Sequence, residues 1–168
     1  MILRCTPASR TMCLLKERQT AVPVVTRSVP NNVGHKLFFD NYFCSPELQI
    51  SLAHRGIHSL GTVRCNRLPN VALISDTELK KKGRGAYVEK VTKVDDVTLS
   101  VVRWFDNRPV TFLSTFVGAQ PTTETKRFSR VTHSEEQIAC PHVVKIHNAH
   151  MGGIDLLHAL IGLYRTHI

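Results

Sequence analysis

The chain has 168 residues, about the length of one domain. Its composition, 42% hydrophobic and 21% charged, is that of an ordinary globular protein and excludes wholesale disorder. Lysine and arginine outnumber aspartate and glutamate by 22 to 13, which gives a formal net charge of +9 at pH 7. A basic excess of this size favours an anionic partner, most commonly nucleic acid; the alternative is a protein that is merely basic.

The cysteines and the apolar segments narrow the class of protein further. Five cysteines are scattered without a CxxC pair, which predicts reduced thiols instead of a disulfide framework. Cys140 has several histidines near it in the sequence, but their spacing matches no familiar zinc-finger pattern. No apolar run approaches the roughly 20 residues that span a bilayer, and the N-terminus lacks the apolar core of a signal peptide. We therefore expect a soluble, intracellular protein with no membrane partner.

The first predicted elements form a strand–helix–strand unit. Residues 1–20 show no useful periodicity, and 21–29 are compatible with a short strand or an extended lead-in. The apolar run at 36–39 predicts a short strand of the kind buried in a central sheet. Ser45 and Pro46 are typical of a helix start, and Gly56 of its end. A second strand is predicted at 57–64, so parallel pairing through a crossover helix is expected.

The middle of the chain differs in composition and is predicted to be mainly β. LKKKGRG at 79–85 predicts a basic, glycine-containing loop. Three strands are predicted after it, at 86–91, 98–105 and 110–117, and their joints, Asp95-Asp96 and residues 106–109, suit hairpin turns. This pattern predicts a β-meander set into the α/β frame. Residues 121–137 are polar and are expected on the surface.

The end of the chain predicts one more helix. Leu156, Leu157, Leu160, Ile161 and Tyr164 recur at helical spacing after a glycine pair at 152–153. Asp155 falls in the first turn of this helix, where the helix dipole favours a carboxylate for purely structural reasons.

Asp40 and Asp155 nevertheless share a setting that suits metal chemistry. Each is expected at the end of a rigid, apolar element, and Mg²⁺ prefers hard oxygen ligands held on such elements. Two-metal phosphoryl chemistry places its ions about 3.5–4 Å apart, so its carboxylates must converge from distant positions in the chain. Spacing alone leaves open whether these two carboxylates converge, because each also has an ordinary local explanation.

Several stretches in fixed order resemble the piggyBac-type transposases and the host proteins derived from piggyBac elements. They are FFDNYFCS at 38–45, GTVRCNR at 61–67, LKKKGRGAY at 79–87, VVRWFDNRPVTFLSTFVG at 101–118 and HNAHMGGIDLLHALIGLYRT at 147–166. The resemblance runs from about residue 29 to residue 166 and covers most of the chain. It implies an α/β fold: a partial ribonuclease H-like core with an inserted antiparallel β-meander, truncated at both ends.

The resemblance also implies the site. Family members carry three metal-binding aspartates, and the matching stretches place the second at Asp40 and the third at Asp155, both as catalytic residues and Mg²⁺ ligands. DNA is the implied partner. Its phosphates would be approached by six basic residues: Arg64, Arg67, Lys80, Lys81, Lys82 and Arg84. For the LKKKGRG stretch, a solvated charged loop without a partner is the alternative.

The resemblance further implies how the chain is divided. Residues 1–20 would be a poorly ordered lead-in outside the family pattern, and 21–66 part of the ribonuclease H-like core with Asp40. Residues 67–140 would be the mainly β insertion, and 141–168 the core helix segment with Asp155.

The chain departs from the family pattern at the first aspartate. Residues 1–39 contain no aspartate, and their one acid, Glu17, does not lie in a stretch that resembles the first catalytic strand. A site that lacks one of three carboxylates should hold Mg²⁺ weakly or not at all. The expectation is therefore a fragment of a transposase catalytic domain, inactive alone; the alternative is a domesticated, non-catalytic DNA-binding remnant. A nuclear location follows from the DNA partner, and a homodimer is expected only of the intact family protein.

Overall fold

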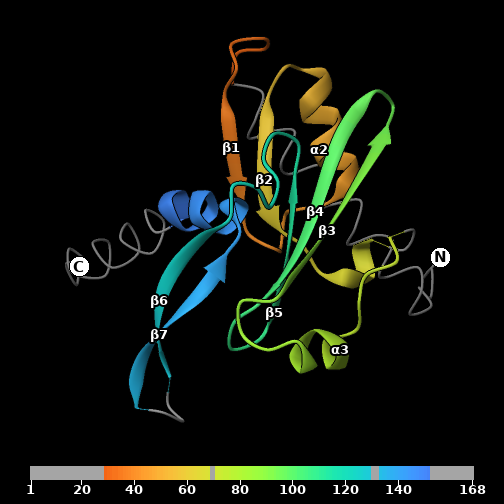
Figure 1. Ribbon diagram of the computed structural model, residues 1–168. Helices are drawn as coiled ribbons and strands as arrows, with labels where there is room; N and C mark the ends of the chain where they lie inside the picture. The colour runs from red at the N-terminus through yellow and green to blue at the C-terminus, as the bar shows by residue number, and fades with distance from the viewer. Residues whose placement is uncertain (1–28, 69–70, 130–132, 152–168) are drawn as a thin grey trace, which may run out of the picture.

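The computed structural model describes residues 29–68, 71–129 and 133–151 of the chain (Figure 1). Its elements follow one another as β1 (Lys36–Phe39), α2 (Pro46–His54), β2 (His58–Thr62), the 3₁₀ turn η2 (Cys65–Arg67), α3 (Asp76–Lys81), β3 (Tyr87–Val94), β4 (Val97–Phe105), β5 (Pro109–Ser114), β6 (Thr123–Ser129) and β7 (Ser134–Cys140). Residues 142–151 form a further helix. The architecture is mixed α/β, as the sequence predicts.

The strand–helix–strand unit forms as expected because its signals are local. The Ser45 hydroxyl accepts a hydrogen bond from the Leu48 amide at 3.3 Å, and Pro46 occupies the first turn of α2, where a missing amide costs nothing. Gly56 follows the helix with φ +67°, a left-handed conformation that favours glycine. Strands β1 and β2 pair in parallel, with Phe38 opposite Leu60. The predicted crossover is therefore confirmed.

The described strands of the main sheet follow the order β1-β2-β5-β4-β3. The β1–β2 pair is parallel, and the other pairs are antiparallel. The turn between β3 and β4 has positive φ at both Asp95 and Asp96, the geometry of a two-residue hairpin. The predicted meander is thus confirmed, and the β2–β5 pair joins it to the strand–helix–strand unit in one sheet. Strand β1 lies at the edge of the described sheet, half-buried, instead of in the buried centre that its apolar run predicts.

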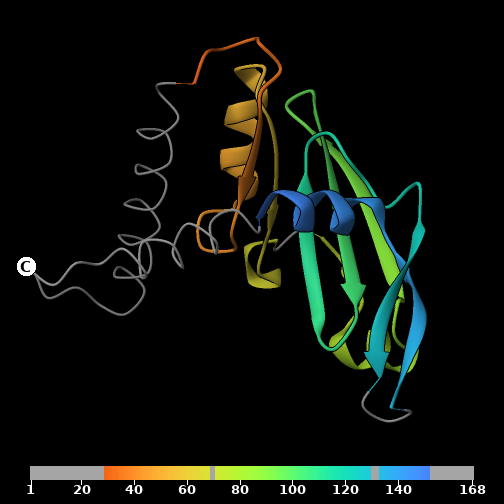
Figure 2. The same cartoon turned by 90° about the vertical axis from the view of Figure 1, so that its left-hand side faces the viewer.

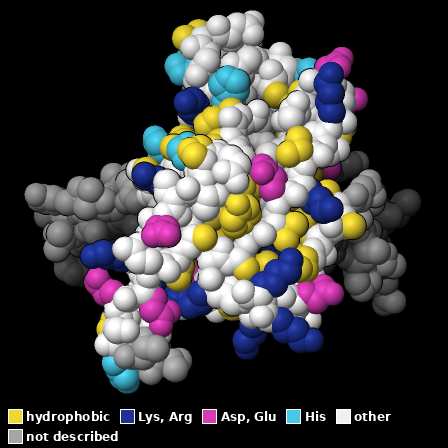
Figure 3. Space-filling model, viewed as in Figure 1, with side chains coloured by type: hydrophobic (Ala, Val, Ile, Leu, Met, Phe, Trp, Pro, Cys, Tyr) yellow, Lys and Arg dark blue, Asp and Glu magenta, His cyan; other side chains and the backbone are white. Residues whose placement is uncertain are grey.

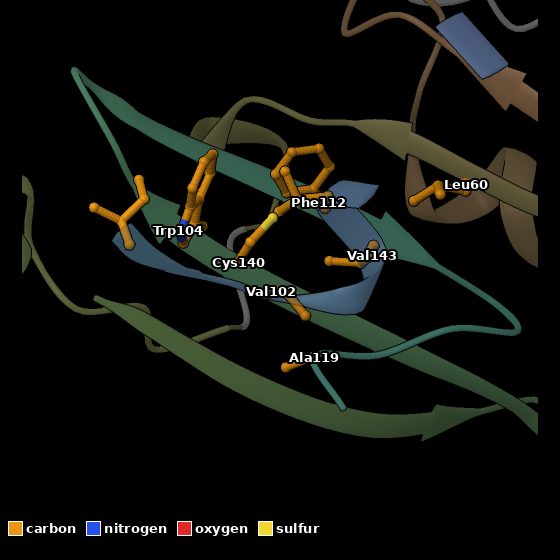
Figure 4. Close-up of a cluster of buried hydrophobic side chains, with 9 residues drawn as sticks. Leu60, Val102, Trp104, Phe112, Ala119, Cys140 and Val143 are labelled. Atoms are coloured by element: carbon orange, nitrogen blue, oxygen red, sulfur yellow. The ribbon is translucent and has the colours of Figure 1, made fainter. Parts of the chain in front are cut away.

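The two faces of the sheet are covered by different elements (Figure 2). Helix α2 buries Leu48 and Leu52 on one face. The helix at 142–151 crosses the other face and packs into the largest core cluster with the β6–β7 hairpin. Figure 4 shows the side chains of Phe112, Cys140 and Val143 gathered in this cluster. The Trp104 indole nitrogen donates to the Ala139 carbonyl at 2.9 Å, which ties the sheet to β7.

The helix at 142–151 begins well before the glycine pair where the sequence predicts a helix to start. Its first turn contains Val143 and Val144, β-branched residues with weak helix propensity, so local preference does not reveal it. The amides of His142 and Val143 donate to the carbonyls of Ala119 and Gly118 at 2.9 and 3.1 Å. These contacts satisfy donors that a helix start otherwise leaves without partners. The helix predicted after residue 153 lies outside the described residues.

Two other segments contain elements that the sequence analysis did not predict. Residues 121–137 lie mostly on the surface, as expected, but they form β6 and most of β7, strands that the sequence analysis did not predict because they contain no continuous apolar run. The first residues of the predicted basic loop at 79–85 are helical, because α3 runs to Lys81. Ser75 caps this helix in a reciprocal pair of hydrogen bonds with Glu78, a capping box that the sequence analysis missed. In the described part of the chain, no helix is long and apolar enough to cross a membrane.

Candidate functional site

Asp40 directly follows the last residue of β1 and begins a tight turn. Its backbone carbonyl accepts hydrogen bonds from the amides of Phe43 (3.1 Å) and Cys44 (3.2 Å). Its side chain is exposed, and Oδ1 accepts from the Asn41 amide at 2.6 Å. The strand and the turn therefore fix the backbone of Asp40 while its carboxylate faces solvent.

Arg67 braces this turn from the 3₁₀ segment after β2. Its Nη1 donates to the carbonyls of Asn41 (2.6 Å), Tyr42 (3.2 Å) and Cys44 (2.9 Å). A guanidinium that serves three backbone carbonyls is held in place by the fold. Arg67, predicted from the sequence as a phosphate contact, thus supports the turn at Asp40. Only the tertiary structure shows that role.

His147, on the helix at 142–151, lies within range of the Asp40 charge. The charge of the Asp40 carboxylate acts on the His147 ring, which also packs edge-to-face on Phe112 with centroids 5.2 Å apart. Burial of the ring lowers the pKa of His147, against the opposing effects of the Asn148 side chain and of Asp40. The helix and the turn at Asp40 therefore lie close enough for this charge effect, although about a hundred positions separate them in the sequence. Sequence analysis missed His147, because only the packing of this helix across the sheet places it there.

The described residues do not by themselves fit a Mg²⁺ site. Asp155 lies outside them, so its position relative to Asp40 stays a prediction. Within the described part of the chain, no group of three or more His, Cys, Asp or Glu side chains could hold a metal ion. A single exposed carboxylate supplies only one of the oxygen ligands that a divalent ion requires. Cys140, weighed above as a zinc ligand, is buried in the core.

The six predicted DNA contacts fall into two groups. Arg64 and the three lysines at 80–82 are exposed. No ion pair involves them among the described residues. Figure 3 shows lysine and arginine side chains gathered at the end of the molecule where α3 lies. The three lysines on α3 and just after it, Lys80, Lys81 and Lys82, form what we call the accessible basic patch.

Arg84 belongs with Arg67 to the second group. Its Nη2 lies 2.5 Å from Asp106 Oδ1, and its Nε donates to the same oxygen at 2.9 Å. Glu136 lies 3.9 Å from the guanidinium. Both partners of the Arg84–Asp106 pair are mostly buried, with 22% and 16% of their side-chain surface exposed. The pair fixes the loop before β3 to the turn before β5.

A comparison with solved structures identifies the fold. The structure is similar to a chain in the cryo-EM structure of a piggyBac transposase synaptic complex with hairpin DNA. The TM-score is 0.56 at 20% sequence identity, and the match covers 87% of this chain and 27% of that one. At this identity the likeness establishes the fold: a mixed α/β sheet of the kind found in piggyBac transposase.

The family follows from the sequence comparison. The model of the family described as Transposase IS4 matches residues 4–168, and the chain belongs to that family. Human PiggyBac transposable element-derived protein 3 is 35% identical over 130 residues, 77% of this chain and 21% of that protein. Human PiggyBac transposable element-derived protein 2 is 32% identical over 134 residues, 80% of this chain and 22% of that protein. The predicted relation to piggyBac-type proteins is confirmed, and the chain spans about a fifth of the length of these relatives.

Proposed function

We propose that the chain is part of a piggyBac-type catalytic domain: a ribonuclease H-like core in which Asp40 is a carboxylate of the DNA-cleaving site. One observation carries the proposal. The helix at 142–151, the last described element before Asp155 in the sequence, crosses the sheet and stacks His150 on Phe38, two residues before Asp40, with ring centroids 4.2 Å apart. The proposal assigns Asp155 to the same site.

A distance measurement tests this assignment. Nitroxide labels on the variants Asp40→Cys and Asp155→Cys, in a chain whose native cysteines are replaced by serine or alanine, give the separation by pulsed electron resonance. We expect a distribution at the short end of the measurable range, as for side chains that share one pocket. A separation that spans the molecule would overturn the assignment. A label pair at Asp40 and Asp96 is the control, since Asp96 lies in the turn at the far edge of the sheet.

The 168-residue chain by itself should cut no DNA. Its first 39 residues contain no aspartate, so a third carboxylate for a two-metal site is lacking. The test is incubation with supercoiled plasmid and Mg²⁺, where nicked circles would signal cleavage. We expect none. Nicking that disappears in Asp40→Ala would overturn the proposed inactivity and would support the site.

DNA binding without cleavage is the second candidate function, and the accessible basic patch favours it. Its three lysines are exposed and lack ion-pair partners among the described residues, so they are free to replace counterions on DNA phosphates. A nuclear location is proposed from this partner. Binding of a duplex oligonucleotide at several salt concentrations measures the number of such contacts.

The lysine variants make this test specific. Replacement of Lys80, Lys81 and Lys82 with glutamine should reduce the slope of log affinity against log salt by about 3. The matched control replaces Lys90, Lys93 and Lys126, which changes the net charge equally but lies on the strands; Lys93 and Lys126 already pair with Asp96 and Glu135. Equal loss in both triples would show a net-charge effect and would contradict a localised patch.

A further inference from the structure

A pocket of about 330 Å³ lies between β1, the segment after β5 and the helix at 142–151. Its volume falls within the range of small-ligand sites. The residues that decide its chemistry are Lys36, Phe38, Phe116, Gln120, His142 and His150. The strand and the helix that form it lie side by side in Figures 1 and 2. Nothing in the proposed function above uses this pocket.

Flat rings dominate the pocket. Phe38 and His150 are stacked, with centroids 4.2 Å apart and an interplanar angle of 3°. His150 Nδ1 lies 2.8 Å from the Ile146 carbonyl, a contact within the helix that holds the imidazole in this orientation. The Lys36 ammonium lies over the half-buried Phe116 ring, 5.1 Å from the ring centroid. The pocket therefore offers aromatic surface and a positive charge side by side.

The lining residues exclude several ligand classes. No carboxylate lines the pocket, so a cation would lack a counter-charge. His142 and His150 lie on one helix, where eight residues correspond to about 12 Å, too far to share a metal ion. A purely apolar ligand would leave the Lys36 ammonium without an anionic partner. The ligand that fits carries a flat ring, polar edges and a negative charge.

We propose that this pocket binds an unpaired nucleotide of a DNA strand. The base would stack on the aromatic rings, the imidazoles would meet its polar edge, and Lys36 would meet the phosphate. Stacking of this kind tolerates any base, because every base has a flat face. The proposal rests on the DNA partner of the proposed function and adds that the bound DNA is locally single-stranded here.

The position of the pocket relative to Asp40 supports this ligand. Side chains alternate along a strand, so Lys36 and Phe38 project from one face of β1, just before the chain reaches Asp40. The helix that carries His142 and His150 also carries His147, whose ring is within range of the Asp40 charge. A strand that approaches the Asp40 carboxylate would pass this pocket, and an unpaired nucleotide adjoining that point could enter it.

The test uses the full 168-residue chain and an oligonucleotide that contains 2-aminopurine, whose fluorescence falls when the base stacks. One probe is single-stranded, and the other is the same sequence as a perfect duplex. We expect quenching with the single strand and little with the duplex.

Lys36→Gln and Phe116→Leu should each weaken single-strand binding about tenfold, as loss of one stacking or phosphate contact does. Lys36 is exposed and Phe116→Leu keeps apolar bulk, so both variants should fold, as circular dichroism verifies.

The controls separate this proposal from the proposed function. Lys90→Gln removes the same charge from β3, at the opposite edge of the sheet from β1, and should leave single-strand binding and quenching unchanged. Duplex binding with no quenching of the single strand would overturn the pocket and leave DNA binding intact. Absence of binding to either probe would overturn both. Equal weakening by Lys36→Gln and Lys90→Gln would also overturn the pocket.

Discussion

Two basic regions of this molecule differ in what their side chains contact. Arg67 donates hydrogen bonds to three carbonyls of the turn after Asp40. The accessible basic patch at Lys80, Lys81 and Lys82 is exposed at the end of α3 and has no ion-pair partner among the described residues. The comparison teaches that positive charge serves this protein in two ways: one region stabilises the fold beside Asp40, and the other is available to a phosphate backbone.

Arg67→Ala should give the largest loss of stability. It removes a charged donor from carbonyls of the Asn41–Cys44 turn, and hydrogen bonds to charged groups are the stronger ones. We expect the free energy of unfolding to fall by about 2–3 kcal/mol. Urea denaturation measures it. Arg64→Ala, an exposed arginine on the same segment, is the control and should change little; equal effects of both variants would contradict the assigned role.

The buried thiol of Cys44, in the turn that Arg67 supports, should make the free energy of unfolding depend on pH. Burial raises the pKa of Cys44 to about 12, against the opposing effects of Gln49 and Arg67. The unfolded thiol ionises near its ordinary 9.0, so the unfolded state loses its proton first. This contribution to stability is complete below that pH and is lost as pH rises toward 12. We expect a fall of about 1.4 kcal/mol for each pH unit in that window.

Cys44→Ala isolates that contribution. The variant is less stable at neutral pH because it leaves a small cavity, but its free energy of unfolding should decline less steeply above pH 9.0. Urea denaturation at several alkaline pH values gives both slopes. Parallel slopes in the two proteins would show that Cys44 does not titrate differently on folding.

Arg84→Met should have a smaller effect than Arg67→Ala. Asp106 loses its 2.5 Å partner but keeps Arg127, whose Nε lies 3.3 Å from Oδ2. We expect a loss of about 1 kcal/mol in the free energy of unfolding, measured by urea denaturation. The control is Lys93→Met, because the Lys93–Asp96 pair is exposed and should contribute almost nothing. A larger loss in the control than in Arg84→Met would refute the distinction between buried and exposed pairs.

Replacement of all three patch lysines with glutamine should have the smallest effect on stability. Exposed side chains outside ion pairs contribute within about 0.5 kcal/mol. The same variant is the one expected to lose DNA affinity, so thermal and urea denaturation should match the parent chain while the salt slope falls. A marked loss of stability would show that these lysines, like Arg67, stabilise the fold. It would contradict the distinction between the two basic regions.

The sequence by itself determined the elements that depend on local signals. The Ser45-Pro46 start and the Gly56 end of α2, the apolar strand before Asp40 and the Asp95-Asp96 hairpin all follow from backbone preferences of neighbouring residues. The ordered motifs also determined the family, because they do not depend on how distant segments pack. The sequence could single out Asp40 as a candidate, since it ends a rigid strand.

Only the tertiary structure decided which distant groups serve one another. The helix at 142–151 begins where carbonyls of residues 118–119 meet its first amides, and the polar β6–β7 strands form because they pair with each other and pack on the core. Arg67 and Arg84 look like the patch lysines in the sequence, yet carbonyls and a carboxylate from other segments engage them. His147 comes within range of the Asp40 charge only through helix packing. Hydrogen bonds and charges act over a few ångströms of space, and the distance between residues along a chain does not specify that space.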